Sequence, residues 1–248
     1  MNQVMVITGA SRGIGAATAR LAAQQGYSIC INYHADEAAA EQVLAQVRAA
    51  GAQAIAVRAD ASVEDEVIRL FQQVDQTLGA VTALVNNAGT IGQQSRLQAM
   101  SEFRLLEVMK TNVVGPMLCA KHALLRMSRH HGGQGGSIVN VSSVAARLGS
   151  PNEYVDYAAS KGALDTFTLG LAKEVAGDGV RVNAVRPGYI HTGFHALSGD
   201  PRRVDKLAPG IPMGRGGQPE EVAEAILWLL SDKASYSTGS FIDLGGGR

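Results

Sequence analysis

The fold is decided by the stretch Val4-Met5-Val6-Ile7-Thr8-Gly9-Ala10-Ser11-Arg12-Gly13-Ile14-Gly15. The first four residues predict a strand buried on both faces, and the residues after the glycines predict a helix that ends near Gly26. A glycine-rich turn between a strand and a helix lets the backbone approach a phosphate, to which the helix offers free N–H groups and its positive dipole end. The glycine spacing is G-x-x-x-G-x-G rather than G-x-G-x-x-G. The stretch therefore predicts a phosphate-binding turn, with a plain tight turn as the alternative.

Strand and helix patterns alternate along the rest of the chain. Short apolar runs predict strands, and apolar residues recurring every three or four positions predict helices. The predicted strands cover residues 27–33, 53–58, 82–85, 137–141, 179–186 and 240–244, and the predicted helices cover 36–50, 63–78, 101–131, 157–175 and 219–230. This alternation is typical of an α/β doubly wound, Rossmann-like parallel sheet, here of about seven strands with helices on both faces. Because no linker or repeat is visible, residues 1–248 are expected to form a single domain.

The composition argues against several classes of protein. The chain has 248 residues, 46% of them hydrophobic and 18% charged, which suffices for one sizeable core. The 22 basic and 22 acidic residues balance, which argues against nucleic acid or an anionic membrane as a partner. Because no transmembrane-length apolar stretch and no signal peptide is visible, a cytoplasmic protein is expected. Cys30 and Cys119 are expected to be reduced, and no metal is expected because His191 and His195 lack further ligands.

The end of the second predicted strand bears on the choice of dinucleotide. An acidic residue at this point binds the ribose of NAD, but the chain has Asn32, Tyr33 and His34 there, and Asp36 is expected to cap the next helix. Without an acid, a 2′-phosphate is not repelled, and Arg12 or a protonated His34 could attract it. NADP(H) is therefore expected in preference to NAD(H), with a solvated Arg12 and NAD(H) as the alternatives.

Tyr157 and Lys161 form the predicted catalytic pair. On a helix, residues four apart lie on one face, so the phenol and the ammonium are expected side by side. A free tyrosine titrates near ~10, and a neighbouring cation favours its phenolate. We therefore expect Lys161 to lower the pKa of Tyr157 into the range of a general acid or base. Alone, the Y-x-x-x-K pattern is also compatible with an ordinary helix face.

Two other positions have residue types suited to this chemistry. Pro116 cannot donate to the carbonyl of Asn112, four residues earlier in a predicted helix, so we hypothesise a break that frees that carbonyl for a bound water. Ser142 and Ser143 end the fifth predicted strand, where a hydroxyl could face a substrate carbonyl. Adjacent strand residues point to opposite sides, so only one of the two serines can face the site.

Taken together, these motifs resemble the short-chain dehydrogenase/reductase family, and within it the 3-oxoacyl reductase-like and glucose dehydrogenase-like members. Each motif is weak alone, but their joint occurrence in this order along the whole chain is specific. The matching positions are Thr8-Gly9, Gly13, Gly15, Asp60, Asn86-Asn87-Ala88-Gly89, Asn112, Ser143, Tyr157, Lys161, Pro187-Gly188, Thr192 and the segment from Pro212 to Gly246. Ser143 lies one residue further from Tyr157 than is common in the family, which an extra residue in the Arg147–Asp156 loop would explain.

The resemblance implies a role for each matching position. Tyr157 would be the general acid/base, Lys161 would assist it and hold the nicotinamide ribose, and Ser143 would orient the substrate carbonyl. Asn112 would support a water-linked proton relay. The implied cofactor-binding residues are Gly9, Ser11, Arg12, Gly13, Ile14, Gly15, Asn32, His34, Asp60, Ala61, Asn87, Ala88, Gly89, Tyr157, Lys161, Pro187, Gly188, Ile190 and Thr192.

The implied function is an NADP-preferring oxidoreductase that moves a hydride between a nicotinamide and a small-molecule carbonyl or alcohol. An NAD-dependent alcohol or sugar dehydrogenase of the same family is the nearest alternative. A non-catalytic dinucleotide sensor and a Rossmann-like methyltransferase are alternatives from other classes, and the intact Ser143, Tyr157 and Lys161 argue against both. The family also implies a homotetramer, or a dimer. A 3-oxoacyl thioester, a sugar lactol and a hydrophobic ketone all remain possible substrates.

Overall fold

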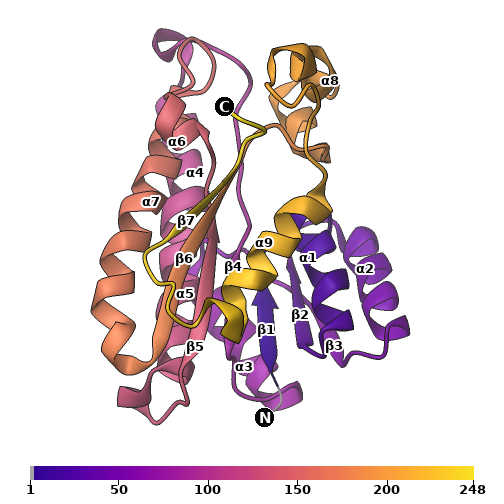
Figure 1. Ribbon diagram of the computed structural model, residues 1–248, viewed down its shortest axis with the longest axis vertical. Helices are drawn as coiled ribbons and strands as arrows, with labels where there is room; N and C mark the ends of the chain where they lie inside the picture. Colours follow the sequence, from indigo (N-terminus) through magenta and orange to yellow (C-terminus); the bar gives the residue numbers. More distant parts are fainter. Residues whose placement is uncertain (1–2) are drawn as a thin grey trace.

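Seven parallel strands form one sheet in the order β3-β2-β1-β4-β5-β6-β7, as the ribbon in Figure 1 shows. The computed structural model describes residues 3–248; the side chains of residues 195–197, and with them that of His195, lie outside this description. The strands are β1 (Val4–Ile7), β2 (Ser28–Tyr33), β3 (Ala54–Arg58), β4 (Ala83–Asn86), β5 (Gly136–Val141), β6 (Val180–Pro187) and β7 (Phe241–Leu244). The predicted doubly wound α/β fold with about seven strands is confirmed.

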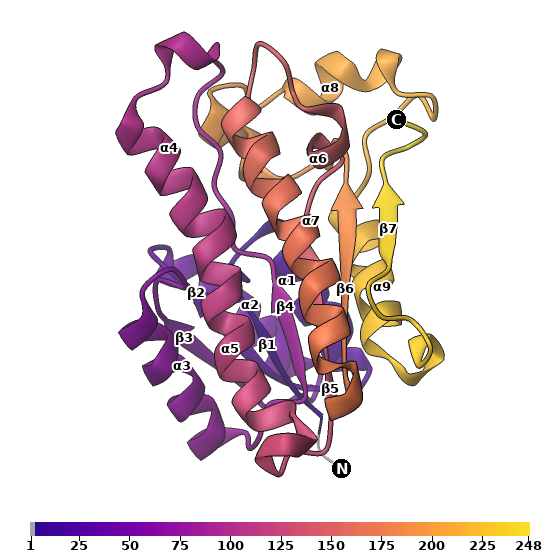
Figure 2. The ribbon, with the colours of Figure 1, turned by 90° about the vertical axis from the view of Figure 1, so that its left-hand side faces the viewer.

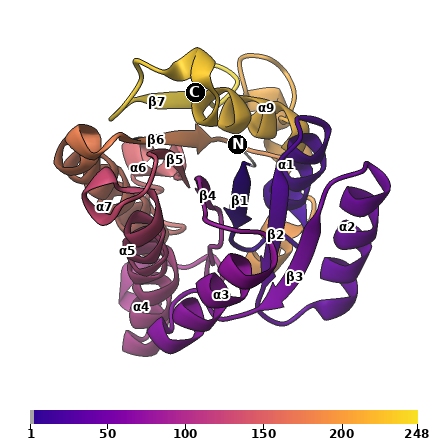
Figure 3. The same ribbon diagram turned by 90° about the horizontal axis from the view of Figure 1, so that it is seen from below.

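The sheet has a separate apolar core on each face, because side chains alternate along every strand. Met5 and Ile7 of β1 pack in one core, and Val4 and Val6 pack in the other. Figure 3 shows helices on both faces of the sheet. One face is covered by α1 (Gly13–Gln24), α2 (Glu37–Ala49) and α9 (Pro219–Leu230), and the other by α3 (Glu64–Thr77), α5 (Gly115–Met127) and α7 (Val155–Val175).

The predicted helix over residues 101–131 is interrupted in the middle. It consists of α4 (Glu102–Met109), a π-helical segment (Lys110–Val114), α5 and a short 3-10 turn (Arg129–His131). Pro116 has no N–H for the carbonyl of Asn112, and the turn before it widens so that the N–H of Gly115 donates to Lys110. The break expected between residues 112 and 116 is thus present as a π-helical segment. Figure 2 shows α4 and α5 end to end along one face of the molecule, with α7 beside them.

The stretch from residue 187 to 217 has no helical period in the sequence, yet it contains three short helical segments. They are a 3-10 segment (Gly193–Ser198), α8 (Arg203–Leu207) and a second 3-10 turn (Ala208–Gly210), which lie above the carboxyl ends of the strands in Figure 1. These elements are too short to produce a helical period in the sequence. We call residues 187–217 the lid. Within residues 3–248, no helix has both the length and the apolarity needed to cross a membrane.

Candidate active site

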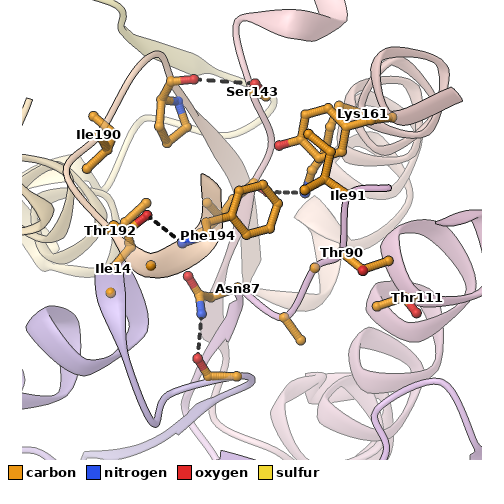
Figure 4. Close-up of a pocket in the computed structure, with 18 of the residues that line it drawn as sticks. Ile14, Asn87, Thr90, Ile91, Thr111, Ser143, Lys161, Ile190, Thr192 and Phe194 are labelled. Carbon is orange, nitrogen blue, oxygen red and sulfur yellow. Dashed lines mark hydrogen bonds between the residues drawn. The ribbon is translucent and has the colours of Figure 1, made fainter. Parts of the chain in front are cut away.

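A cavity of about 570 Å³ lies at the carboxyl ends of the strands, beneath the lid. Its size is within the range of small-molecule and cofactor sites. Figure 4 shows residues of the glycine turn, of β5 and α7, and of the lid converging on it. These residues converge at this edge because the strands are parallel, so that the carboxyl ends of all the strands lie there.

The glycine turn has the geometry of a phosphate cradle. Gly9 and Gly13 have φ values of 61° and 56°, which side chains other than glycine rarely adopt. Helix α1 starts after Arg12 without a side-chain cap, so its first N–H groups stay open to the cavity. Both features fit the pyrophosphate of a dinucleotide.

Two asparagines hold this turn in place. The Asn87 amide donates to the carbonyls of Thr8, at 2.9 Å, and Gly9, at 3.0 Å, as seen in Figure 4. The Oδ1 of buried Asn32 accepts from the N–H of Gly9 at 3.3 Å, and its Nδ2 donates to Ala59 at 2.9 Å. Asn32 was expected to contact the cofactor; it lines the cavity, and both ends of its amide also bond protein atoms. Its side chain therefore supports the turn.

At the end of β2, the expected 2′-phosphate site has an acidic neighbour. Asp36 caps α2 as predicted, through its Oδ1 and the N–H of Ala39, and its Oδ2 accepts from Arg12 Nη2 at 3.2 Å. Both side chains are exposed. His34 and Asp60 line the same part of the cavity. Burial raises the pKa of Asp60, but hydrogen bonds from Ser62 outweigh it and hold that pKa below its usual value.

Both serines line the cavity, but only the Ser143 hydroxyl lies beside Tyr157. The Ser143 hydroxyl donates to the carbonyl of Pro187 at 3.4 Å and lies near enough to the phenol to act against the rise of the Tyr157 pKa. The hydroxyl of Ser142 points the other way and donates to the carbonyl of Lys161 at 3.3 Å. The alternation of strand side chains thus settles which serine lies beside the phenol.

The electrostatics of Tyr157 and Lys161 differ from the sequence expectation. Lys161 Nζ lies 5.7 Å from the centroid of the Tyr157 ring and donates to the carbonyl of Val141 at 2.8 Å. Burial raises the pKa of Tyr157 to about 12, and the Ser143 hydrogen bond opposes this only partly. The expected lowering of the Tyr157 pKa by Lys161 is therefore wrong for this structure, because removing the phenolate from water outweighs every stabilising contact.

Lys161 itself is strongly affected by burial, which lowers its pKa to about 8 against the opposing effect of Asp165, one helical turn further on. Only 4% of Lys161 is exposed. The ammonium is thus charged at neutral pH but close to its titration point.

Asn112 is fully buried, and its side chain is engaged with protein atoms. The Oδ1 accepts from the N–H of Thr90 at 2.8 Å, while Nδ2 donates to the Thr90 carbonyl at 2.9 Å and to Ser160 Oγ at 3.0 Å. It therefore ties the loop after β4 to α7. A Cβ on Gly89 would lie 3.3 Å from Asn112 Oδ1, so the backbone there passes close to this amide.

The lid places two predicted contacts and one unpredicted ring at the cavity. Ile190 and Thr192 line it as expected, and Thr192 lies against Gly13 of the glycine turn. Phe194 was not predicted; its ring centroid lies 5.9 Å from that of Tyr157, and Figure 4 shows it in the middle of the site. No local pattern in the sequence marks Phe194, because the lid brings it there only through tertiary packing.

All but one of the other predicted cofactor positions lie at the cavity. The cavity is lined by Ser11, Arg12, Ile14, Ala61, Ala88, Gly89, Pro187 and Gly188. Gly15 does not line it but packs against the neighbouring loop, where an added Cβ would lie 2.6 Å from Asn87 Nδ2 and 2.8 Å from the Gly9 carbonyl.

Gly15→Ala is therefore expected to force the glycine turn apart. We expect it to lower the free energy of unfolding by about 1–3 kcal/mol, measured by urea denaturation. Gly162→Ala is the matched control, because nothing lies within 4 Å of its Cβ on helix α7, and it should be neutral or stabilising. Equal effects of the two substitutions would contradict the close packing at Gly15.

Lys161 should give the protein a pH-dependent stability. Its folded pKa is about 8 and the ordinary lysine value is 10.5, so between these values the unfolded chain binds more protons and the free energy of unfolding rises with pH. From about pH 7 to pH 9.5, the wild type should gain about 2 kcal/mol relative to Lys161→Met. Urea unfolding at both pH values measures this difference. A parallel pH dependence in the two proteins would mean that Lys161 titrates normally.

Comparison with known proteins places this site in a family. The family model described as enoyl-(acyl carrier protein) reductase matches residues 9–248. The chain is 55% identical over 245 residues to the uncharacterized oxidoreductase YgfF of Escherichia coli, covering 99% of both chains. It is 36% identical over 248 residues to the 3-oxoacyl-(acyl-carrier-protein) reductase FabG of Staphylococcus epidermidis, covering 100% of this chain and 99% of the relative.

Solved structures agree with these relatives. A short-chain dehydrogenase/reductase from Burkholderia xenovorans superposes with a TM-score of 0.87 at 32% identity, covering 99% of this chain and 97% of the other. A doubly substituted short-chain dehydrogenase/reductase from Serratia marcescens superposes with a TM-score of 0.90 at 28% identity, with the same coverage of both chains. The glycine turn, the Ser143–Tyr157–Lys161 cluster and these matches lead to one conclusion: the chain belongs to the short-chain dehydrogenase/reductase family and is an NAD(P)-dependent oxidoreductase.

Proposed function

We propose that this enzyme is an NADP-preferring oxidoreductase with Tyr157 as its general acid/base. It would catalyse the reduction of carbonyl compounds or the oxidation of the corresponding alcohols. One observation carries the proposal: Ser143 and Tyr157 line the same cavity as the glycine turn, with the Ser143 hydroxyl near enough to the phenol to favour its phenolate form and act against the rise of the Tyr157 pKa. Two hydroxyls at one point can both donate to a single carbonyl oxygen, which is the arrangement that stabilises a developing negative charge.

The residues around the cavity would divide the work of holding a dinucleotide. The glycine turn would bind the pyrophosphate, Asp60 and Ala61 would flank the adenine, and Ile190 and Thr192 would contact the carboxamide. A bound nicotinamide supplies the hydride. The protein's part is to orient the substrate carbonyl over it and to exclude water beneath the lid.

Tyr157 would deliver the proton. Its raised pKa keeps the phenol protonated at neutral pH, as a proton donor must be. Ser143 would hold the substrate oxygen in place, and the ammonium of Lys161 would stabilise the phenolate that remains. The Asn112 carbonyl, left without a proline N–H partner, would support the water that returns a proton to Tyr157. Alcohol oxidation would follow the same steps in reverse.

The preference for NADP rests on the end of β2. No acid occupies residues 32–34, and Arg12 and His34 lie where they could meet a 2′-phosphate. The Arg12–Asp36 ion pair works against this preference, because Asp36 already partly neutralises the guanidinium. NAD is therefore the alternative cofactor, and parallel assays of turnover with NADPH and NADH distinguish the two.

The decisive test is consumption of NADPH, with NADH in parallel, across ketones, aldehydes, quinones and 3-oxoacyl thioesters. Tyr157→Phe and Ser143→Ala should lower kcat by about 10²- to 10⁴-fold, because each removes a donor to the substrate oxygen. Ser142→Ala is the matched control and should retain activity, since its hydroxyl faces α7.

Three outcomes are distinguishable. Turnover that persists in Tyr157→Phe would contradict the general-acid role. Faster turnover with NADH would reverse the cofactor preference. Tight binding of NADPH without any turnover would favour the non-catalytic sensor.

We also propose a homotetramer, or a dimer, formed through the face that Figure 2 presents. Large apolar side chains are exposed there on α4, on the π-helical segment, on α5 and on α7: Phe103, Leu106, Met109, Val114, Met117, Leu125 and Leu169. Apolar patches of this kind usually mark an interface.

Sedimentation analysis should therefore give an oligomer for the wild type. Phe103→Glu combined with Leu106→Glu should shift it toward monomers, because two charges would be buried without partners. The same change at an exposed site of α2, Gln46→Glu, should leave the mass unchanged. A monomeric wild type would contradict the proposal.

A further inference from the structure

Arg203, the first residue of α8, has an unusual position for a cation. It lines the cavity, and only 7% of the residue is exposed. Its Nη2 donates to Glu153 Oε2 at 2.5 Å, while its Nε and Nη1 have no hydrogen-bond partner among the described residues. Buried guanidinium groups normally use their whole fork of donors. Half of this fork is thus available to a ligand.

The guanidinium is held rigidly. It lies 5.2 Å from the centroid of the Tyr154 ring and 5.7 Å from that of Tyr189. Glu153 is anchored in turn by Gln94, whose Nε2 donates to Glu153 Oε1 at 3.2 Å. Stacking and ion pairing fix the plane of the fork before any ligand binds, which favours recognition of a planar anion.

Tyr154 provides an independent observation. It lines the cavity immediately before α7, three residues from Tyr157, and 4% of it is exposed. Its hydroxyl is buried and has no hydrogen-bond partner in the part of the chain that the structure describes. A buried hydroxyl without a partner is uncommon, and a ligand oxygen at this point would satisfy it.

A second cation lies at this end of the cavity. Arg248 lies 5.0 Å from the centroid of the Tyr189 ring, the ring that Arg203 also approaches, and within residues 3–248 it forms no ion pair. A cation without an ion-pair partner attracts an anion.

We propose that the substrate carries a carboxylate remote from its reacting carbonyl, and that the free donors of Arg203, with the hydroxyl of Tyr154, bind it. This inference rests on the proposed carbonyl chemistry and names a substrate class for it. A purely structural link between the lid and the loop that joins α6 (Ala145–Leu148) to α7, made by Arg203 and Glu153, needs only one edge of the guanidinium. It leaves the free edge and the unpartnered Tyr154 hydroxyl unexplained.

The test compares oxo acids with their methyl esters, which lack the negative charge and have one additional methyl group. For wild type, kcat/KM should be higher for 4-oxopentanoate and 5-oxohexanoate than for their esters. Arg203→Met should lower kcat/KM for the acids by about 10- to 100-fold, mainly through KM, and leave the esters within about 2-fold. Tyr154→Phe should weaken the same preference without removing any protein contact of the hydroxyl. Arg202→Met, at the exposed neighbouring position, is the matched control and should change neither.

Equal wild-type kcat/KM for acid and ester, or an equal loss for both in Arg203→Met, would overturn the carboxylate site while leaving the proposed reductase intact. If the wild type turns over neither, the proposed function fails first. Calorimetric measurement of 4-hydroxypentanoate binding then tests the carboxylate site independently of turnover. Binding to wild type that Arg203→Met and Tyr154→Phe weaken would support it, and equal binding to all three would overturn it. If Arg203→Met does not fold, Tyr154→Phe gives the same readouts.

Discussion

The hydrogen bonds from the Asn87 amide to the carbonyls of Thr8 and Gly9 are the contacts on which the site depends. They join the end of β4 to the end of β1 at the point where the glycine turn departs. Asn32 holds the same turn from the side of β2. The positive φ of Gly9 leaves its carbonyl unable to join the sheet, and the two amides supply the partners that a buried backbone needs.

A second set of buried polar contacts places α7 against this turn. Asn112 links the loop after β4 to Ser160 of α7, and Asn140 of β5 donates to Thr168 on the same helix at 2.8 Å. These bonds fix the helix that carries Tyr157 and Lys161 at a defined height above the sheet. Burial then sets the protonation of both residues, raising the pKa of the phenol and lowering that of the ammonium. The packing that positions α7 therefore also determines the acid–base properties of Tyr157 and Lys161.

Sequence patterns predicted what depends on local spacing. The α9 boundaries, the Asp36 cap, the break before Pro116 and the glycine turn each follow from residue types a few positions apart. The short helices of the lid were not predicted, because they leave no period in the sequence. The Tyr157 pKa was predicted in the wrong direction, because the spacing of Lys161 gives its proximity but not the loss of water around the phenol.

The sequence by itself determined the alternation of strands and helices, the phosphate-binding turn and the Tyr157–Lys161 pair, since all three are encoded in neighbouring residues. Only the tertiary structure decided that Ser143 rather than Ser142 meets the phenol, that Asn32 supports the turn, and that Arg203 and Tyr154 reach the same cavity. Those relations join residues 14 to 49 positions apart, whose contact is set by how the lid and α7 pack on the sheet. Long-range packing, rather than local propensity, therefore defines the part of the site that selects a substrate.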